Sequence, residues 1–243
     1  MKKVIIIGAS SGIGKTLAEH YASGGCQVAV AARREECLRE IQAKFPGQVQ
    51  YCVMDVSDQG ASGLFRSMIS NLGGVDLVIY CSGAGKSSSD LDFAIEKQTV
   101  DVNVRGFLNI IVPAFNHFAS LNCRPQIRPQ IVTISSVASI RGLSPTPSYS
   151  ATKRFQTIYF EALEQKAYKM GLDITFTAIM PGFIATDFIH RCHPFTMELP
   201  YASKFIIKAI EKRRRRAVID WKWSLIATFM KLVPSSIWRR IKL

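Results

Sequence analysis

The sequence predicts an α/β fold in which helices cover both faces of one parallel sheet. Three observations predict it. Short apolar runs recur along the 243-residue chain without alternating polar residues, as in strands that are buried on both faces. Helix-like stretches separate these runs, and an alternation of strands and helices builds a parallel sheet. A glycine-rich loop joins the first run to the first helix-like stretch.

Six apolar runs define the expected strands, and Gly or Pro residues mark several of their ends. The strands are expected at residues 4–7, 27–31, 50–54, 76–80, 131–134 and 174–179. The helices are expected at residues 13–23, 35–44, 58–71, 94–120, 148–170 and 202–212. Right-handed crossovers turn this order into a doubly wound, Rossmann-type sheet. We expect one domain over residues 1–212 and a basic, Trp-rich extension over 213–243 that is part of the domain or interfacial.

The positive charge of the chain is concentrated near its C-terminus. The formal net charge is +13, of which residues 204–243 contribute +10 and residues 1–203 only +3. A basic segment beside a nearly neutral body favours an anionic partner, such as a lipid headgroup layer or an acidic carrier protein. Nucleic acid is the least favoured anionic partner and is not expected.

The cysteines and the N-terminus indicate the compartment. Six cysteines are scattered in no metal-binding or redox spacing, so we interpret them as free thiols of a reducing, cytoplasmic environment with no metal site. The apolar run after Lys3 has four residues, too few for the ~7–15-residue core of a signal peptide. No run reaches the ~18 uncharged apolar residues of a membrane span. We therefore expect neither secretion nor a transmembrane anchor.

The glycine loop after the first expected strand indicates a nucleotide site. Glycines let the backbone turn tightly and approach a pyrophosphate, and the following helix offers free N–H groups and a positive dipole end. The loop residues expected to bind the cofactor are Gly8, Ser10, Ser11, Gly12, Ile13 and Gly14.

The tips of the second and third strands predict which dinucleotide binds. An acidic residue at the second tip would accept the ribose hydroxyl of NAD, whereas Arg pairs with the 2′-phosphate of NADP. Here Arg33 and Arg34 follow the strand, so we expect NADP(H), with Arg33 as the main phosphate contact. The alternative is two solvated surface arginines. Asp55, at the third tip, is expected to accept from the adenine amino group or, alternatively, to cap a turn or helix.

Tyr149 and Lys153 lie four residues apart in an expected helix, so they share one helix face. A free tyrosine has a pKa of about 10, and a neighbouring ammonium lowers it by favouring the phenolate. Reduction of a carbonyl needs such a phenol, which gives its proton to a developing alkoxide and then recovers it. We therefore expect Lys153 to lower the pKa of Tyr149.

These segments together resemble the short-chain dehydrogenase/reductase family over about residues 3–212. The family's T-G-x-x-x-G-x-G motif matches the glycines of the loop at 8–14. Its active-site Tyr and Lys fall on Tyr149 and Lys153, and its active-site Ser falls on Ser136, thirteen residues before the Tyr.

The resemblance implies a role for each matching residue in a carbonyl reduction with NADPH. Tyr149 would donate the proton, and Ser136, rather than its neighbour Ser135, would hold the carbonyl oxygen. Lys153 would bind the nicotinamide ribose hydroxyls, and Asn103 would support a water relay to Lys153. The further cofactor contacts that the resemblance implies, with Ile184 beside the nicotinamide carboxamide, are Gly83, Pro181, Gly182, Ile184 and Thr186.

Three departures from the family pattern concern structure more than chemistry. The N-N-A-G segment after the fourth strand is Tyr80-Cys81-Ser82-Gly83 here, so the hydrogen bonds of its asparagine side chains are absent or replaced. Ile7 stands where a Thr hydroxyl often braces the glycine loop. Many tetrameric members end in a Gly-Gly-containing strand, whereas this chain continues with residues 217–220 and the Trp-rich segment. We therefore do not expect that tetramer, and a homodimer stays open.

The extension over 213–243 interleaves Trp, Leu and Phe with Lys and Arg, which is the composition of an interfacial segment. Its longest uncharged run, Trp223–Met230, is too short to span a membrane. Two interpretations stay open. The extension seats the protein on an anionic membrane, or its aromatic face packs on the protein body or on a second subunit.

The family carries its substrate lid where this chain has residues 187–200. Most of this segment is apolar, as is Leu143, which predicts a lipophilic carbonyl substrate. His190 and His193 in the same segment are not expected to bind a metal or to act in catalysis. We expect an NADPH-dependent enzyme that interconverts a carbonyl and a secondary alcohol. The alternatives are a 3-oxoacyl-carrier-protein reductase that docks an acidic carrier, and a non-catalytic NADPH-binding sensor or scaffold.

Overall fold

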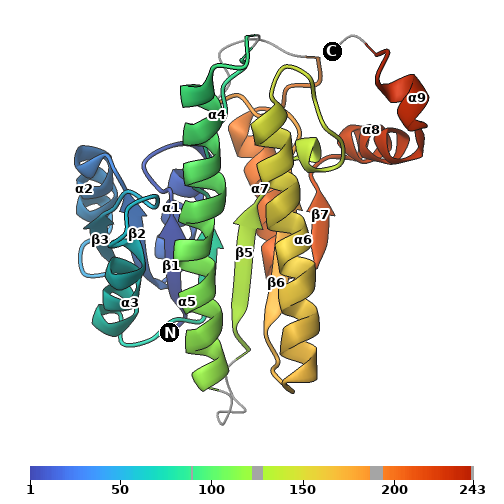
Figure 1. The fold of residues 1–243 in the computed structure, drawn as a ribbon. Coiled ribbons are helices and arrows are strands. Elements are labelled where there is room, and N and C mark those ends of the chain that lie inside the picture. Colours follow the sequence, from blue (N-terminus) through green and yellow to red (C-terminus); the bar gives the residue numbers. More distant parts are fainter. Residues whose placement is uncertain (89, 122–127, 187–193, 242–243) are drawn as a thin grey trace.

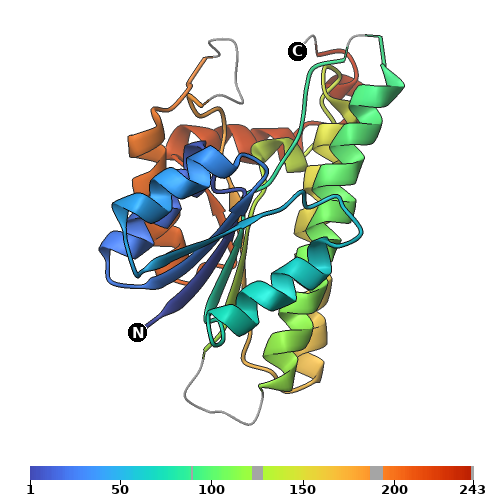
Figure 2. The ribbon, with the colours of Figure 1, turned by 90° about the vertical axis from the view of Figure 1, so that its left-hand side faces the viewer.

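The computed structural model describes residues 1–88, 90–121, 128–186 and 194–241. In this part of the chain, seven parallel strands form one twisted sheet in the order β3-β2-β1-β4-β5-β6-β7 (Figures 1 and 2). The strands are β1 (Lys3–Ile7), β2 (Gln27–Ala32), β3 (Val49–Val53), β4 (Leu77–Tyr80), β5 (Gln130–Ile134), β6 (Thr175–Met180) and β7 (Arg216–Val218).

Helices connect the strands and cover both faces of the sheet (Figure 2). They are α1 (Gly12–Ser23), α2 (Glu35–Lys44), α3 (Ala61–Asn71), α4 (Phe93–Val100), α5 (Gly106–Ser120), α6 (Pro147–Lys169) and α7 (Leu199–Glu211). After β7 the chain ends in α8 (Trp221–Leu232) and the single turn α9 (Ser235–Trp238). No helix in the described ranges is long and apolar enough to cross a lipid bilayer.

The central strands are buried on both faces, as their unbroken apolar runs predict. In β1, Val4 and Ile6 join a core beneath α1, α2 and α7, whereas Ile5 and Ile7 join a second core beneath α3, α5 and α6. All four side chains are fully buried. Successive side chains of a strand point to opposite faces, so one apolar run fills both cores. The predicted doubly wound α/β fold is confirmed.

Two elements differ from the sequence prediction. The helix expected over 94–120 is α4 and α5 joined by a π-helical segment, Asp101–Arg105. A seventh strand, β7, pairs with β6 where only an extension was expected. Its three residues begin with the last arginine of the block at 213–216, and a run this short carries no strand signal of its own. The extension expected from residue 213 therefore begins inside the sheet.

All strands end at the upper edge of the sheet in Figure 1, and this carboxyl edge positions the site. The strand order reverses between β1 and β4, and ligands of doubly wound sheets bind outside the carboxyl ends at such a point. The C-terminal helices α8 and α9 lie at the same edge, beyond β7 (Figure 1).

Candidate active site

The glycine loop lies at the switch point, where β1 passes into α1. Gly8 has a φ of +89°, and a Cβ there would lie 2.6 Å from the Ser82 backbone nitrogen. A Cβ on Gly14 would overlap the Gly8 carbonyl, so the turn closes only with glycine at both positions. Gly12, also at positive φ, is the first residue of α1. The glycines thus let the loop turn tightly into the N-terminus of α1, which fits a pyrophosphate.

The arginines after β2 lie beside this loop. The Arg34 guanidinium donates hydrogen bonds to the Ser10 hydroxyl at 3.0 Å and to the Ser11 hydroxyl at 2.7 Å. Arg33 is two-thirds exposed, and its Nη1 lies 3.8 Å from a carboxylate oxygen of Asp55. The structure thus brings together the positive charges and hydroxyls that a ribose phosphate requires.

Asp55 lies at the end of the third strand, as expected, and its carboxylate also shapes the local turn. Its Oδ1 accepts hydrogen bonds from the Ser57 backbone N–H at 2.9 Å and from the Ser57 hydroxyl at 2.6 Å. Burial raises the pKa of Asp55, but these hydrogen bonds and the Arg33 charge outweigh burial and lower the pKa overall. The turn role that the sequence left as an alternative is therefore present.

Tyr149 and Lys153 face the same side of α6, close to Ser136 at the end of β5. The Ser136 hydroxyl and the Tyr149 phenol are joined by a hydrogen bond. The Lys153 ammonium lies 5.7 Å from the centre of the Tyr149 ring. The neighbouring Ser135 is turned away, because its hydroxyl donates to the Lys153 backbone carbonyl at 3.1 Å. The structure therefore brings Ser136, and not Ser135, to the phenol.

Asn103 lies in the π-helical segment and clamps the loop after β4. Its side-chain oxygen accepts from the Ala84 N–H at 2.8 Å, and its amide donates to the Ala84 carbonyl at 2.7 Å. The same amide donates to the Thr152 hydroxyl at 3.0 Å, which ties the loop to α6. Asn103 is fully buried. π-Helical turns commonly occur at functional sites, where they redirect a side chain.

Lys153 is held in a buried polar network that includes Gln156. The ammonium donates to the Ile134 carbonyl at 2.8 Å and to the Gln156 side-chain oxygen at 3.4 Å. The Gln156 amide donates in turn to the Asn103 carbonyl at 2.9 Å. Because buried polar groups are costly unless paired, this network fixes the positions of its members.

Burial controls the protonation of Tyr149 and Lys153. It raises the pKa of Tyr149 to about 12, and the hydrogen bond with Ser136 lowers the pKa by less. Burial lowers the pKa of Lys153 to about 8, against a smaller opposing effect of Cys81. The predicted lowering of the Tyr149 pKa is therefore wrong for this arrangement, since burial dominates and the opposing effect comes from Ser136. Tyr149 is a neutral phenol, the form that can donate a proton.

The segment after β6 lies against both the glycine loop and the turn after Ser136. The Pro181 carbonyl accepts from the Val137 N–H at 3.0 Å, and Ile184 forms a parallel bridge with Met197. A methyl carbon of Thr186 lies 3.4 Å from the position of a Cβ on Gly12, so this segment meets the glycine loop. The structure thus brings both cofactor segments that the sequence predicted to one crevice.

The residues at and after the end of β4, where the family has asparagines, make contacts of their own. The Tyr80 hydroxyl donates to the Val102 carbonyl at 2.8 Å, which links the sheet to the π-helical segment. The Cys81 backbone N–H donates to the Ile7 carbonyl at 2.7 Å. Gly83 lies beside the site: a Cβ there would be 3.4 Å from the Lys153 ammonium.

Sequence reasoning missed Gly85 and Gln156. A Cβ on Gly85 would overlap the Tyr149 ring, so the loop after β4 packs directly on the phenol. The G-x-G spacing of Gly83 and Gly85 is a signal of close backbone approach that could have found it. No sequence signal marks Gln156, because its contacts come from three separate elements.

Part of the predicted lid, with His190 and His193, lies outside the described residues. Within the described ranges, no group of three His, Cys, Asp or Glu side chains is placed to hold a metal. Four of the cysteines, Cys26, Cys37, Cys52 and Cys81, are free thiols.

A tight glycine turn at a helix N-terminus at the switch point, with a phenol and a lysine at the same edge of the sheet, is the arrangement of oxidoreductases that use a nicotinamide cofactor. The chain belongs to the short chain dehydrogenase family, whose sequence pattern matches residues 2–194.

Several curated proteins are similar in sequence. Glycine betaine reductase of Emericella nidulans is 31% identical over 194 residues, which are 77% of this chain but only 15% of that longer protein. An oxidoreductase of Mycobacterium tuberculosis is 27% identical over 251 residues, covering 98% of this chain and 96% of that protein. Very-long-chain 3-oxoacyl-CoA reductase of Rattus norvegicus is 24% identical over 214 residues, covering 85% and 67%.

Solved structures share the fold. A short chain dehydrogenase from Burkholderia cenocepacia in complex with NADP superposes with a TM-score of 0.83 at 18% identity, and the match covers 100% of both chains. A 3-ketoacyl-(acyl-carrier-protein) reductase from Brucella melitensis complexed with NADH gives 0.79 at 19% identity, covering 89% of this chain and 94% of that one. The protein is therefore an oxidoreductase of the short chain dehydrogenase fold.

Proposed function

We propose that the protein is an NADPH-dependent reductase that interconverts a carbonyl and a secondary alcohol on an apolar substrate. The observation that carries the proposal is the hydrogen bond between Ser136 and Tyr149, with the Lys153 ammonium 5.7 Å from the phenol ring. A paired hydroxyl and phenol at the mouth of a nucleotide crevice can bind one carbonyl oxygen from two sides.

The proposed reaction adds one hydride and one proton across the C=O bond. The nicotinamide cofactor supplies the hydride to the carbonyl carbon when it is bound. Tyr149 donates its phenolic proton to the oxygen as the negative charge develops there, and Ser136 orients the same oxygen by a hydrogen bond. Lys153 stabilises the phenolate that remains, and Asn103 holds the loop beside it. In the alcohol-oxidising direction the same phenolate takes the proton back.

The proposed cofactor is NADP(H), bound by the glycine loop, Gly83 and the segment from Pro181 to Thr186. Arg33 and Arg34 carry positive charge beside the loop, and the loop hydroxyls of Ser10 and Ser11 already bind Arg34. This set supports a 2′-phosphate contact, because guanidinium groups bind phosphate oxygens strongly. We assign Arg33, the more loosely held of the two side chains, as the main phosphate contact.

An apolar, lipid-like substrate is supported by the described part of the lid. Phe195 is half exposed, and Met197 is buried against Ile184, one of the predicted cofactor contacts. The rat relative is named for very-long-chain 3-oxoacyl-CoA reduction, which is the same kind of substrate. A carrier-bound 3-oxoacyl group is the second candidate, since the basic extension would suit an acidic carrier. A sensor or scaffold without catalysis is disfavoured, because it has no need of a phenol with three buried polar residues positioned around it.

The proposed setting is the cytoplasmic side of an anionic membrane, which the 213–243 extension contacts. A lipid-like substrate resides there, and the extension is rich in both basic and aromatic residues.

The test is NADPH oxidation over a panel of carbonyls. Long-chain 3-keto lipids in mixed micelles are compared with short soluble ketones and aldehydes, each also with NADH. Tyr149→Phe is the matched control: we expect turnover to fall by about 10²–10⁴-fold while NADPH still quenches protein fluorescence. Turnover that survives in Tyr149→Phe, or that is absent from every carbonyl, contradicts the proposal. Turnover with small carbonyls alone would contradict the assignment of a lipid-like substrate but would support the proposed carbonyl reduction.

A further inference from the structure

The C-terminal helix α8 has two apolar faces, and only one is covered by protein. Its buried residues, Trp223, Ala227 and Met230, point into the body. On the opposite side, Trp221, Leu225, Phe229 and Leu232 form a stripe that spans about 80° of the helix. Their exposed fractions are 66%, 62%, 62% and 77%. Large apolar side chains that gather on one exposed face mark an interaction surface.

Hydrogen bonds and ring packing on the covered side of α8 hold the exposed stripe in a fixed orientation. The Trp223 indole donates to the Phe195 carbonyl at 3.1 Å and packs edge-on against Phe183 with 5.4 Å between ring centres. Asp220 caps the start of α8 by accepting from the Lys222 N–H at 2.7 Å, and it also accepts from the Tyr201 hydroxyl at 3.0 Å. The stripe is therefore part of a folded element, and no ordering of a loose tail is needed to present it.

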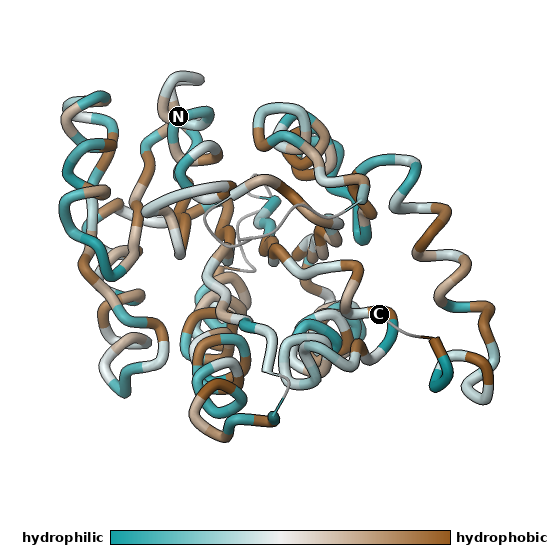
Figure 3. Tube along the Cα trace, turned by 90° about the horizontal axis from the view of Figure 1, so that it is seen from above, coloured by the Kyte–Doolittle hydropathy of each residue, from teal (hydrophilic) through white to brown (hydrophobic). Residues whose placement is uncertain are grey.

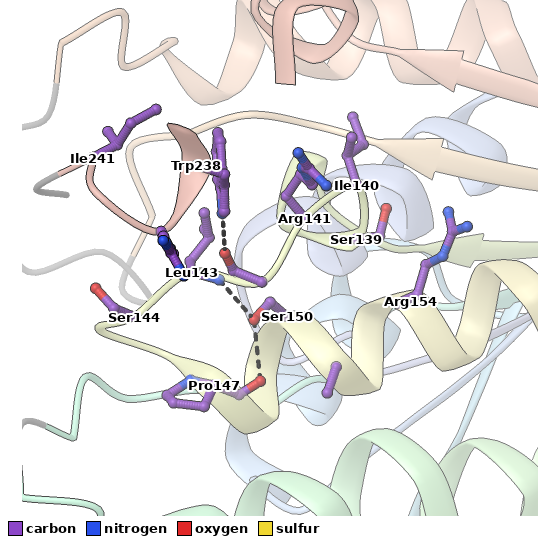
Figure 4. Close-up of a pocket in the computed structure, with 13 residues that line it drawn as sticks. Ser139, Ile140, Arg141, Leu143, Ser144, Pro147, Ser150, Arg154, Trp238 and Ile241 are labelled. Atoms are coloured by element: carbon purple, nitrogen blue, oxygen red, sulfur yellow. Dashed lines mark hydrogen bonds between the residues drawn. The ribbon is translucent and has the colours of Figure 1, made fainter. Parts of the chain in front are cut away.

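The following turn, α9, is also docked on the body. The Trp238 indole donates to the Gly142 carbonyl at 2.9 Å, and the Arg141 guanidinium lies 5.4 Å from the Trp238 ring (Figure 4). Arg141 also donates to the Val233 carbonyl. Ile237, on the same turn, is half exposed and extends the apolar stripe.

The charges that follow the capping residue Asp220 along α8 and α9 all have one sign. From Trp221 to Ile241 the sequence contains no Asp or Glu, and its four basic residues are exposed. These residues are Lys222, Lys231, Arg239 and Arg240. The tube in Figure 3 shows hydrophobic and hydrophilic residues in turn along the helices near the C-terminus.

A basic, apolar-walled pocket adjoins the same surface. It has a volume of about 680 Å³ and lies between α9, the start of α6 and the loop over 139–147 (Figure 4). Arg141, Arg154 and Arg239 line it together with Leu143, Trp238 and Ile241, and none of its described lining residues is acidic. The Arg141 Nε is buried there without a hydrogen-bond partner among the described residues.

We propose that α8 and α9 form a docking face for an anionic lipid bilayer. The stripe inserts into the headgroup–acyl boundary, and the surrounding cations contact anionic headgroups, one of which the arginine-lined pocket accommodates. A second copy of the chain is a poorer occupant, because apposing two such faces would bring eight like charges together, while Asp220 of each copy is already bound to the Lys222 N–H and the Tyr201 hydroxyl. The inference rests on the membrane setting of the proposed function but not on its chemistry.

The docking face lies at the edge of the sheet that carries the site. Trp223 joins the covered side of α8 to Phe195 in the lid, and the pocket loop begins three residues after Ser136. Docking through α8 and α9 would therefore bring this edge of the molecule, with Phe195 and the pocket loop, close to the bilayer, where a lipid-like carbonyl resides.

The test is co-sedimentation of the full chain with vesicles of phosphatidylcholine alone or mixed with phosphatidylglycerol. We expect the wild type to bind the anionic vesicles at least about tenfold better, and less well at high salt. The triple variant Trp221→Ser, Leu225→Ser, Phe229→Ser loses about tenfold or more of this binding. The control variant has Ser at Leu64, Phe93 and Tyr168, three exposed large side chains outside α8 and α9. We expect it to bind the vesicles as the wild type does.

A second variant tests the basic residues of the docking face. Substituting Gln at Lys222, Lys231, Arg239 and Arg240 removes the preference for phosphatidylglycerol, at about fivefold per charge. Gln at Arg66, Lys86, Lys166 and Lys169 is the control and leaves the preference intact. Vesicle binding that is unchanged in both test variants overturns the proposal. The proposal is also overturned if the wild type does not bind vesicles, is a dimer in light scattering, and becomes a monomer in the triple Ser variant.

Thermal unfolding and NADPH binding show whether each variant is folded. Tyr149→Phe separates this inference from the proposed function, because it removes turnover but leaves vesicle binding unchanged. Vesicle binding without turnover then contradicts only the chemistry, and turnover without vesicle binding contradicts only the docking face.

Discussion

The cluster around Tyr149 and the C-terminal helix α8 lie at one edge of the sheet and distribute their side chains in opposite ways. In the cluster, polar side chains are inside: Asn103 and Gln156 are fully buried, and Lys153 is 3% exposed. On α8, apolar side chains are outside, with Leu232 77% exposed. Folded proteins rarely bury polar groups without partners or expose large apolar groups together.

These opposite distributions indicate that the two regions have different functions. Burial of Asn103, Lys153 and Gln156 has a desolvation cost, and the hydrogen bonds among them offset it by fixing one geometry. The exposed stripe of α8 contributes nothing to folding by burial. Proteins depart from the usual pattern of apolar residues inside and polar residues outside mainly at functional sites. The buried polar cluster and the exposed apolar stripe therefore both indicate function.

One residue connects the two regions. A Cβ on Gly182 would overlap the Trp223 indole, so the buried side of α8 packs directly on the segment that follows β6. That segment carries the predicted cofactor contacts, which makes α8 part of the wall behind the site as well as an outer surface.

The largest expected effect tests this double role of α8. Trp223→Ala removes a 6%-exposed indole with its hydrogen bond, whereas Trp221→Ala removes a 66%-exposed one from the same helix. We expect Trp223→Ala to lower the free energy of unfolding by about 3–5 kcal/mol, and Trp221→Ala to change it by less than about 0.5 kcal/mol. Denaturant unfolding measures both. Equal losses would mean that the two faces of α8 are not distinct.

The next effect concerns how tightly the cluster is fixed. In Gly85→Ala the new methyl group overlaps the Tyr149 ring, so the phenol must move. We expect kcat/KM to fall by about 10²-fold, because a displacement of about 1 Å at a proton donor has this cost. Gly63→Ala in α3 is the control, since a Cβ there meets no atom within 4 Å. A Gly85→Ala enzyme as active as that control would show that the loop does not position the phenol.

The smallest effect is a pH dependence of NADPH binding. The pKa of Lys153 is about 8, below its ordinary value of 10.5, because burial disfavours the ammonium. The ammonium that would bind the ribose hydroxyls is therefore present below pH 8 and lost as the pH rises through 8. We expect the NADPH dissociation constant to rise about tenfold across this range, since one charged hydrogen bond is lost. Fluorescence titration measures it, and Lys153→Met should show weak binding with no such step.

Much of the fold and the site follows from local pattern. The doubly wound sheet was predictable because a strand buried on both faces needs an unbroken apolar run, which β1 and β4 have. Helix periodicity predicted that Tyr149 and Lys153 share one face, whereas Ser136 was located by the family resemblance and the spacing that it implies. The meeting of Gly12 with Thr186 follows from the same parallel topology.

Other features depend on contacts between distant segments. The π-helical turn that aims Asn103 at Ala84 has no local signal, because its hydrogen-bond partners lie on a loop and on α6. The pKa of Tyr149 was mispredicted for a similar reason. A spacing of four residues places an ammonium nearby, but only packing decides how much water the phenol loses.

The amino-acid sequence was enough to predict a parallel sheet and the glycine loop. It also showed the order of the Ser, Tyr and Lys residues along the chain and the basic, aromatic character of the C-terminal extension. Only the tertiary structure decided that this extension begins with a strand, and that its aromatic residues divide into a packed and a bare side. Composition counts Trp221 and Trp223 alike. Their environments differ because successive side chains of a helix point in different directions, and only the docking of α8 on Phe183 and Gly182 chooses which of them is covered.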